Sequence, residues 1–274
     1  SSGSSNGDWL THPAFTFGSD ELNGIWVGKF ETTGDNNTPT VKPGIPALRS
    51  QNVSTQFDIA NKFNNETIYG LTASEDAHMM KNMEWGAVAY LSHSKYGKNE
   101  EIWKNPSRDY LTGCAGTSVN VSSSTGCAYH YYTENGKEAS TTGNVYGIYD
   151  ISGGTYEVVM GGMYNSDNTT MMLGYSGFSQ ETIDSPAMGK YIDKYTYGTT
   201  SNDQLALNRR KLGDATGETR GWYSDSVDFI NSSGSWLLRG GLSYDGSSNG
   251  AFSFFADNGY ASTYNGFRLV VSIK

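Results

Sequence analysis

The chain carries few side chains with strong nucleophilic or metal-binding chemistry. Its two cysteines, Cys114 and Cys127, enclose the polar segment CAGTSVNVSSSTGC. A structural metal site would need further Cys or His ligands close by, so the pattern favours a disulfide, with two free thiols as the alternative. A disulfide closing this loop would add about 3 kcal/mol through loop entropy. It would also indicate an oxidising, extracytoplasmic setting.

The four histidines, His12, His78, His93 and His130, show no catalytic pattern. None lies in a helical H-E-x-x-H motif or beside a clear nucleophile. His78 and His93 fall on one predicted helix, about four turns apart, and therefore cannot share a metal ion. We expect structural or surface roles for all four, and we assign no catalytic residue and no metal ligand.

An acidic loop, LGDATGETRGWYSD, contains Asp214, Glu218 and Asp225. Carboxylate and main-chain oxygens of such a loop could bind Ca²⁺. The loop lacks the EF-hand spacing, so the sequence favours structural hydrogen bonding, with a structural Ca²⁺ as the alternative and no other cofactor. A carboxylate pair for glycoside hydrolysis stays open, because its defining separation is a matter of geometry.

Residues 242–265, LSYDGSSNGAFSFFADNGYASTYN, have the composition of an adaptable binding surface. Tyr supplies contact area at low entropy cost, while Ser, Asn and Gly supply flexible hydrogen bonding. The alternative is a turn-rich β segment with exposed small polar residues. Strand alternation places Phe252 and Phe254 inward. The predicted solvent-facing contact residues are Tyr244, Asp245, Ser253, Phe255, Ala256, Asp257, Asn258, Tyr260, Ser262, Thr263, Tyr264 and Asn265.

The composition excludes several classes of protein. Aromatic residues make up 13% of the 274 residues, which argues against wholesale disorder. The net charge is −9 and no basic run exceeds Arg209-Arg210-Lys211, so a nucleic-acid partner is disfavoured. No apolar run approaches the roughly 20 residues of a membrane-spanning helix. We expect no membrane span.

The local patterns predict an α+β fold. Ser54 could cap a helix with Phe57, Ala60 and Phe63 on one face, and apolar spacing predicts a longer helix over 77–96. Strands are expected at 24–31 and 266–274, with several short strands between them. We interpret 1–20 as a linker or N-terminal stub and 21–274 as a single domain with a long insertion around 176–220.

Three stretches resemble the formylglycine-generating-enzyme and sulfatase-modifying family. They are GKFETT at 28–33, NVYGIYDISGGTYE at 144–157, and the pair LRGG at 238–241 and GFR at 266–268. The resemblance implies a C-type-lectin-like fold with a small twisted antiparallel sheet, two helices and many ordered loops. The N- and C-terminal strands pair in that fold. Arg239 and Arg268 of the closing motifs would be structural, pairing with buried carboxylates or carbonyls.

The chain departs from the enzymes of that family at the catalytic site. Those enzymes bind copper through two cysteines in the C-terminal third, and this chain has no cysteine from 128 to 274. Thiolates are the ligands that select Cu(I). The sequence therefore predicts a non-enzymatic relative, with a formylglycine-generating-type oxidoreductase as a disfavoured alternative.

The segment between RGG and GFR is similar to that of the variable proteins of diversity-generating retroelements. Their mutagenesis acts mainly on Asn codons and cannot produce Lys, Glu, Gln, Met or Trp. These five types are absent from residues 242–267. The resemblance implies a surface-display protein, on a bacterium or phage and therefore extracellular, that binds a protein or glycan ligand through 242–265. A structural pilin or phage-tail component is the second alternative.

Overall fold

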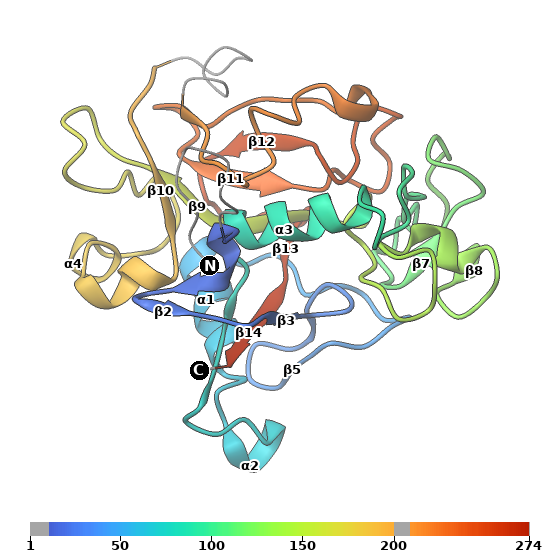
Figure 1. The fold of residues 1–274 in the computed structure, drawn as a ribbon, viewed down its shortest axis with the longest axis horizontal. Helices are drawn as coiled ribbons and strands as arrows, with labels where there is room; N and C mark the ends of the chain where they lie inside the picture. Colours follow the sequence, from blue (N-terminus) through green and yellow to red (C-terminus); the bar gives the residue numbers. More distant parts are fainter. Residues whose placement is uncertain (1–10, 200–208, 274) are drawn as a thin grey trace.

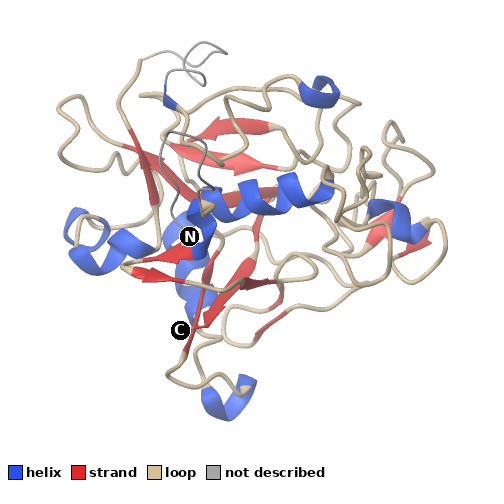
Figure 2. Ribbon diagram, in the orientation of Figure 1, coloured by secondary structure: helices blue, strands red, loops and turns tan. Residues whose placement is uncertain are grey.

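The computed structural model describes residues 11–199 and 209–273, which form a mixed α+β fold with much ordered loop (Figures 1 and 2). Its α-helices are α1 (Val53–Asn61), α2 (Glu66–Tyr69), α3 (Asn82–Ser92) and α4 (Gln180–Ile183). Its 3-10 helices are η1 (Pro13–Phe15), η2 (Gly136–Ala139), η3 (Pro186–Lys190) and η4 (Trp222–Ser224). Its strands are β1 (Thr16–Phe17), β2 (Asp20–Glu21), β3 (Ile25–Val27), β4 (Thr33–Gly34), β5 (Pro39–Thr40), β6 (Glu75–Met79), β7 (Cys114–Ala115), β8 (Tyr129–His130), β9 (Tyr156–Met163), β10 (Asp193–Tyr195), β11 (Trp236–Arg239), β12 (Phe254–Asp257), β13 (Asn265–Phe267) and β14 (Leu269–Ile273).

The largest sheet is built around β9. β11 pairs antiparallel with β9 and with β12, while β10 and β13 run parallel to β9. All residues of β9 after Tyr156 are buried, which fits its nearly continuous apolar sequence YEVVMGGM. The sheet is therefore mixed, whereas the other sheets, of two or three strands, are antiparallel.

A second sheet joins the two ends of the chain in the order β3-β14-β6. β14 pairs antiparallel with both neighbours, with Val271 opposite Trp26 and Val270 opposite His78. The expected pairing of an N-terminal with a C-terminal strand is thus present. The N-terminal strand is shorter than predicted from 24–31, because only three of those residues pair with β14.

The helix predicted over 77–96 is wrong at its N-terminal end. Residues 75–79 form strand β6, so His78 lies in a sheet, and His93 is the C-terminal cap of α3. α3 begins where the Glu84 carboxylate accepts a hydrogen bond from the main chain of Lys81 at 2.8 Å. Pairing with β14 outweighs the helical spacing of the apolar residues before this point.

The helix expected near residue 54 is α1, but a different residue caps it. The Asn52 side chain accepts from the main chain of Thr55 at 3.1 Å, two residues before the predicted cap at Ser54. Phe57 and Ala60 are buried as predicted, and Phe63 is buried just beyond the end of the helix. The expected apolar face of α1 therefore packs into the core, in the same cluster as Val158 and Trp236.

The domain boundary predicted at residue 20 does not separate a linker from the fold. It falls inside the β1–β2 hairpin, and Phe17 of β1 is buried against His78 with ring centroids 4.8 Å apart. Residues 1–10 of the predicted linker lie outside the described part of the chain. The predicted insertion at 176–220 supplies β10 and buried Ile183 and Met188, so its described residues are part of the core.

Two large tryptophans lie in the interior. Trp85 of α3 donates to the Ala251 carbonyl at 2.9 Å, and Trp236 of β11 donates to the Leu173 carbonyl at 3.0 Å. Each indole thus has a partner, as buried Trp requires.

Within residues 11–199 and 209–273, no helix has the length and apolar character needed to cross a bilayer.

Candidate functional site

The C-terminal segment folds back over the largest sheet. The chain leaves β11 through Gly240 and Gly241, whose φ angles are +84° and +72°, and it returns as β12. A Cβ on Gly241 would lie 2.4 Å from the Cβ of Asn249 across the loop. Glycine is therefore required here, and the RGG motif sets the shape of the loop at 240–253.

The two arginines of the closing motifs are fully buried and hold the scaffold beneath this loop. Arg268 forms a two-pronged ion pair with Glu157 of β9, with Nε to Oε2 at 2.9 Å. Arg239 donates to the Ala215 carbonyl at 2.9 Å. The structural roles predicted for both arginines agree with these contacts.

Arg268 lies among three buried carboxyl groups, those of Glu31, Asp150 and Glu157. Burial raises the pKa of Glu157 to about 7, although Arg268 opposes the shift. Burial likewise raises the pKa of Asp150 to about 6 and places that of Glu31 well above its usual range. One guanidinium cannot neutralise three carboxylates, so this cluster favours protonation.

Nine of the twelve predicted contact residues reach the surface. Tyr244, Tyr260 and Tyr264 are exposed by 43%, 47% and 45%, and Thr263 is exposed as well. The half-buried ones are Asp245, Phe255, Ala256, Asp257 and Asn258. Phe252 and Phe254 are buried, as strand alternation predicted.

Three predicted contact residues are buried, so the prediction that they face solvent is wrong. The Ser253 hydroxyl donates to the Gly250 carbonyl at 2.8 Å, which turns it into the loop. The Ser262 hydroxyl accepts from the main chain of Tyr264 at 3.1 Å. Asn265 lies in β13, paired with β9. Local hydrogen bonds and strand pairing thus remove polar residues that the sequence pattern alone places outside.

One end of the exposed surface is a tyrosine cluster. The Tyr244 and Tyr264 rings meet edge to face at 6.0 Å. Burial, together with hydrogen bonds to Tyr264 and Tyr110, raises the pKa of the Tyr244 hydroxyl. Arg49 stacks 4.1 Å above the Tyr110 ring and donates to the Thr263 carbonyl at 2.6 Å.

The middle of the surface is fixed by Asp245. Its carboxylate accepts from the Tyr156 hydroxyl at 2.6 Å, and the Tyr156 ring lies 5.2 Å from that of Phe255. The buried Lys104 donates to the carbonyls of Asp245 and Gly246 from below. Burial lowers the pKa of Lys104 to about 8, against the opposing charge of Asp245.

A further part of the surface is the stretch at 257–260, which begins at the last residue of β12. The Asp257 carboxylate accepts from the main chain of Gly259 at 2.6 Å, and the Asn258 carbonyl accepts from the main chain of Tyr175 at 2.6 Å. The main chain of Tyr175, whose side chain is exposed, therefore lies beside Asn258. We call the exposed and half-buried predicted residues, together with Arg49, Tyr110, Tyr156 and Tyr175, the C-terminal surface.

These last four residues were missed by sequence reasoning. Arg49 reaches the surface beside residue 263 because it stacks on the buried Tyr110 and bonds the Thr263 carbonyl, and no local pattern marks either residue. Tyr156 lies in the motif at 144–157, which was interpreted as scaffold. The C-terminal surface is consequently broader than the segment 242–265.

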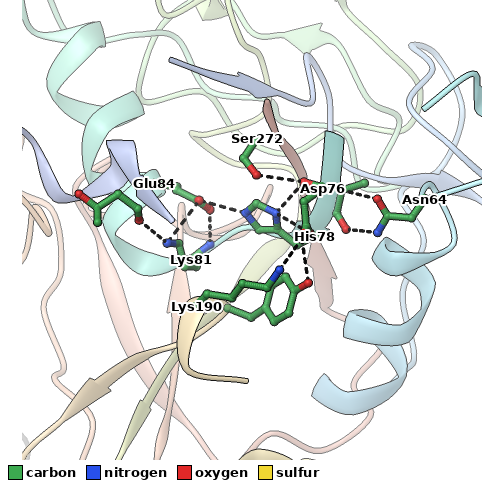
Figure 3. Close-up of polar contacts among 10 residues, drawn as sticks. Asn64, Asp76, His78, Lys81, Glu84, Lys190 and Ser272 are labelled. Carbon is green, nitrogen blue, oxygen red and sulfur yellow. Dashed lines mark hydrogen bonds and ion pairs between the residues drawn. The ribbon is translucent and has the colours of Figure 1, made fainter. Parts of the chain in front are cut away.

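A second polar cluster surrounds His78 (Figure 3). The buried imidazole contacts the Glu84 carboxylate at 3.0 Å, and Lys190 pairs with Asp76 at 2.6 Å. Lys81 donates to the Thr16 carbonyl, which ties the β1–β2 hairpin to α3. The contacts of the cluster join β6 to α3, to η3 and to the β1–β2 hairpin, so we assign it a structural role (Figure 3).

The remaining chemical candidates are occupied by structural contacts. Cys114 and Cys127 form a disulfide, with Cα atoms 5.3 Å apart. In the acidic loop, Asp214 accepts from the main chain and hydroxyl of Thr216, and Asp225 accepts from the main chain of Phe252. Over the described ranges, no three His, Cys, Asp or Glu side chains are grouped so that they could hold a metal ion.

Comparison with known proteins adds no relative: neither the known family models nor the curated protein sequences contain a match to this chain.

Proposed function

We propose that this chain is a non-enzymatic binding protein that holds a protein ligand on its C-terminal surface. The observation that carries the proposal is that Tyr244, Tyr260 and Tyr264, all nearly half exposed, lie on one segment between the buried Arg239 and Arg268. Tyrosines of this kind are the usual anchors of binding surfaces, because they bring contact area with few rotatable bonds. Arg49 adds the other side chain that is typical of such anchors.

The proposed fold is C-type-lectin-like, of the formylglycine-generating-enzyme type. Three features support it: the pairing of β3 with β14, the buried Arg268–Glu157 pair, and the glycine turn after Arg239. The last two involve the sequence stretches on which the resemblance rests, and β3 and β14 directly adjoin the stretches at 28–33 and 266–268. The resemblance of the segment at 242–265 to the variable proteins of diversity-generating retroelements is the basis for proposing that this segment is diversified.

The copper chemistry of the related enzymes does not fit this chain. Both cysteines are consumed by one disulfide, and neither lies in the C-terminal third. The chain therefore offers no thiolate pair of the kind that copper would need there. We therefore propose no copper-dependent activity. We also propose display on a bacterial or phage surface, because a disulfide persists in that oxidising setting.

A display library tests the proposal directly. One library randomises six surface positions, Tyr244, Ala256, Asn258, Tyr260, Thr263 and Tyr264, and is selected on immobilised hen lysozyme as a test ligand. The proposal expects folded members with affinities of about 1 μM or better, the range that small tyrosine-rich surfaces reach.

The matched control library randomises the buried positions Ser253, Ser262 and Asn265. We expect it to lose display and thermal stability, because these residues carry loop and strand contacts. If the surface library unfolds to the same extent, or if it gives no binder, the C-terminal surface is structural. That result would favour the alternative of a structural pilin or phage-tail component. A reverse-transcriptase gene beside the coding sequence, with an adenine-rich near-copy of its 3′ end, would test the retroelement link separately.

A further inference from the structure

A second surface, on a different part of the molecule, is formed by the outer edge of β3. Within the described ranges, β3 pairs with β14 and with no strand on its other side. It is a short edge strand with the sequence Ile-Trp-Val, without the charge, proline or bulge that usually protects a free edge. Its backbone is therefore open to a further strand.

The register shows which main-chain groups are free. The Gly28 N–H donates to the Leu269 carbonyl at 2.8 Å, so residue 28 belongs to a hydrogen-bonded pair of the antiparallel ladder. Such pairs alternate along the strand. The main-chain groups of Trp26 thus face β14, whereas those of Ile25 and Val27 face outward.

An apolar slot of about 640 Å³ runs beside this edge. β3 lines one side, and α3 with the turn at 141–148 lines the other, through residues such as Val88, Leu91 and Ile148. None of the lining residues is charged. Trp26 and Tyr146, exposed by 69% and 89%, are also among them.

We propose that this slot binds an extended, uncharged segment of another polypeptide, which adds to β3 as a fourth strand. The outward groups of Ile25 and Val27 require a partner with an extended backbone, and strand addition is a common way to recognise peptides. The uncharged lining requires apolar side chains at alternate positions of that segment. The slot is walled by β3 on one side and by α3 with the turn at 141–148 on the other, so the added segment would lie between them.

The test selects peptides from a phage-displayed library of random twelve-residue sequences on the full-length protein. Each enriched peptide is then measured against Val27→Pro, which removes one outward N–H, and Ala87→Arg, which fills the slot from α3. Each variant should weaken binding by about tenfold or more, the value of one or two lost hydrogen bonds or of a blocked side-chain site. Tyr132→Ser, which changes an exposed aromatic residue outside the slot, should leave binding unchanged.

N-methylation of the peptide separates strand addition from simple apolar docking. Methyl groups on alternate peptide nitrogens should abolish binding in one register and spare it in the other, because only every second N–H faces β3. Equal binding in both registers would overturn the proposal, as would a library that gives no peptide preferring the wild type over Val27→Pro. If the protein dimerises and Val27→Pro abolishes the dimer, the occupant of the slot is a second copy of the chain and not a peptide of another protein.

Thermal unfolding and circular dichroism verify that each variant is folded. If Val27→Pro unfolds, Ile25→Pro and Ala87→Arg carry the same comparison, since the first removes another outward N–H and the second leaves β3 intact.

Discussion

Replacing Asp150 with Asn should make the stability of the protein less sensitive to pH. Asp150 is fully buried, and burial raises its pKa from the usual 3.8 to about 6. A carboxyl group with a raised pKa in the folded state favours folding below its unfolded pKa, and that advantage is lost as pH rises through the folded pKa. A shift of about two units corresponds to about 3 kcal/mol, lost between about pH 4 and 7.

The substitution suits the local geometry. Asp150 has a φ of +65°, a conformation that Asn tolerates better than most residues. Its Oδ1 accepts from Asn105 and from the main chain of Gly113, both at 2.8 Å, and an amide oxygen can accept these bonds, whereas the longer Gly113 bond to Oδ2 at 3.0 Å is lost. The main change is therefore the loss of a charge beside Glu157, whose own pKa that charge raises.

Urea unfolding at several pH values between 4 and 7.5 measures the effect. The quantity to follow is the free energy of unfolding of Asp150→Asn minus that of the wild type, which should rise by about 3 kcal/mol toward neutral pH. Asp109→Asn, at an exposed carboxylate, is the control and should give a flat difference. A flat difference for Asp150→Asn as well would refute the account of the carboxyl cluster.

Three further outcomes are expected from urea unfolding at neutral pH. Phe254→Ala should lower the free energy of unfolding by about 3–5 kcal/mol, because the ring is fully buried, whereas Tyr260→Ser should change it by about 0.5 kcal/mol or less. Replacing both Cys114 and Cys127 with Ser should cost about 3 kcal/mol through the opened loop; no loss would contradict the disulfide's role. Gly241→Ala should destabilise by at least about 1 kcal/mol, because φ is +72° and the new Cβ would overlap Asn249; a neutral effect would contradict the packing of this loop.

The sequence could predict features that local pattern or flanking motif determines. Alternation placed Phe252 and Phe254 inside, and the motifs marked Arg239 and Arg268 as buried. The predicted helix over 77–96 failed at His78 because β14, nearly 200 residues away, pairs with β6. The place of Arg49 on the C-terminal surface could not be predicted for the same reason, since its partner Thr263 lies 214 positions further along the chain.

The misplacement of Ser253, Ser262 and Asn265 has a different cause. All three are small polar residues in a turn-rich segment, where composition predicts exposure. Their burial depends on which side chains satisfy the hydrogen bonds of a particular loop, and several turn geometries are compatible with the same composition. The predicted exposure therefore fails for Ser253, Ser262 and Asn265, and ligand contact by the other nine residues stays a prediction.

Main-chain hydrogen bonds hold part of the C-terminal surface, which is what the proposed variation of its side chains would need. Between β12 and β13, the carbonyls of Asn258, Gly259 and Ser262 accept hydrogen bonds from the main-chain N–H groups of Tyr175, Val53 and Ser50. These bonds do not depend on the side chains at 260, 263 or 264, whereas the Asn258 side chain itself accepts from the main chain of Tyr260. A substitution there changes the exposed chemistry while the loop keeps its anchors. Positions held by side-chain bonds, such as Ser262, lack this freedom, so the division between variable and fixed positions should follow the hydrogen bonds more closely than the sequence composition.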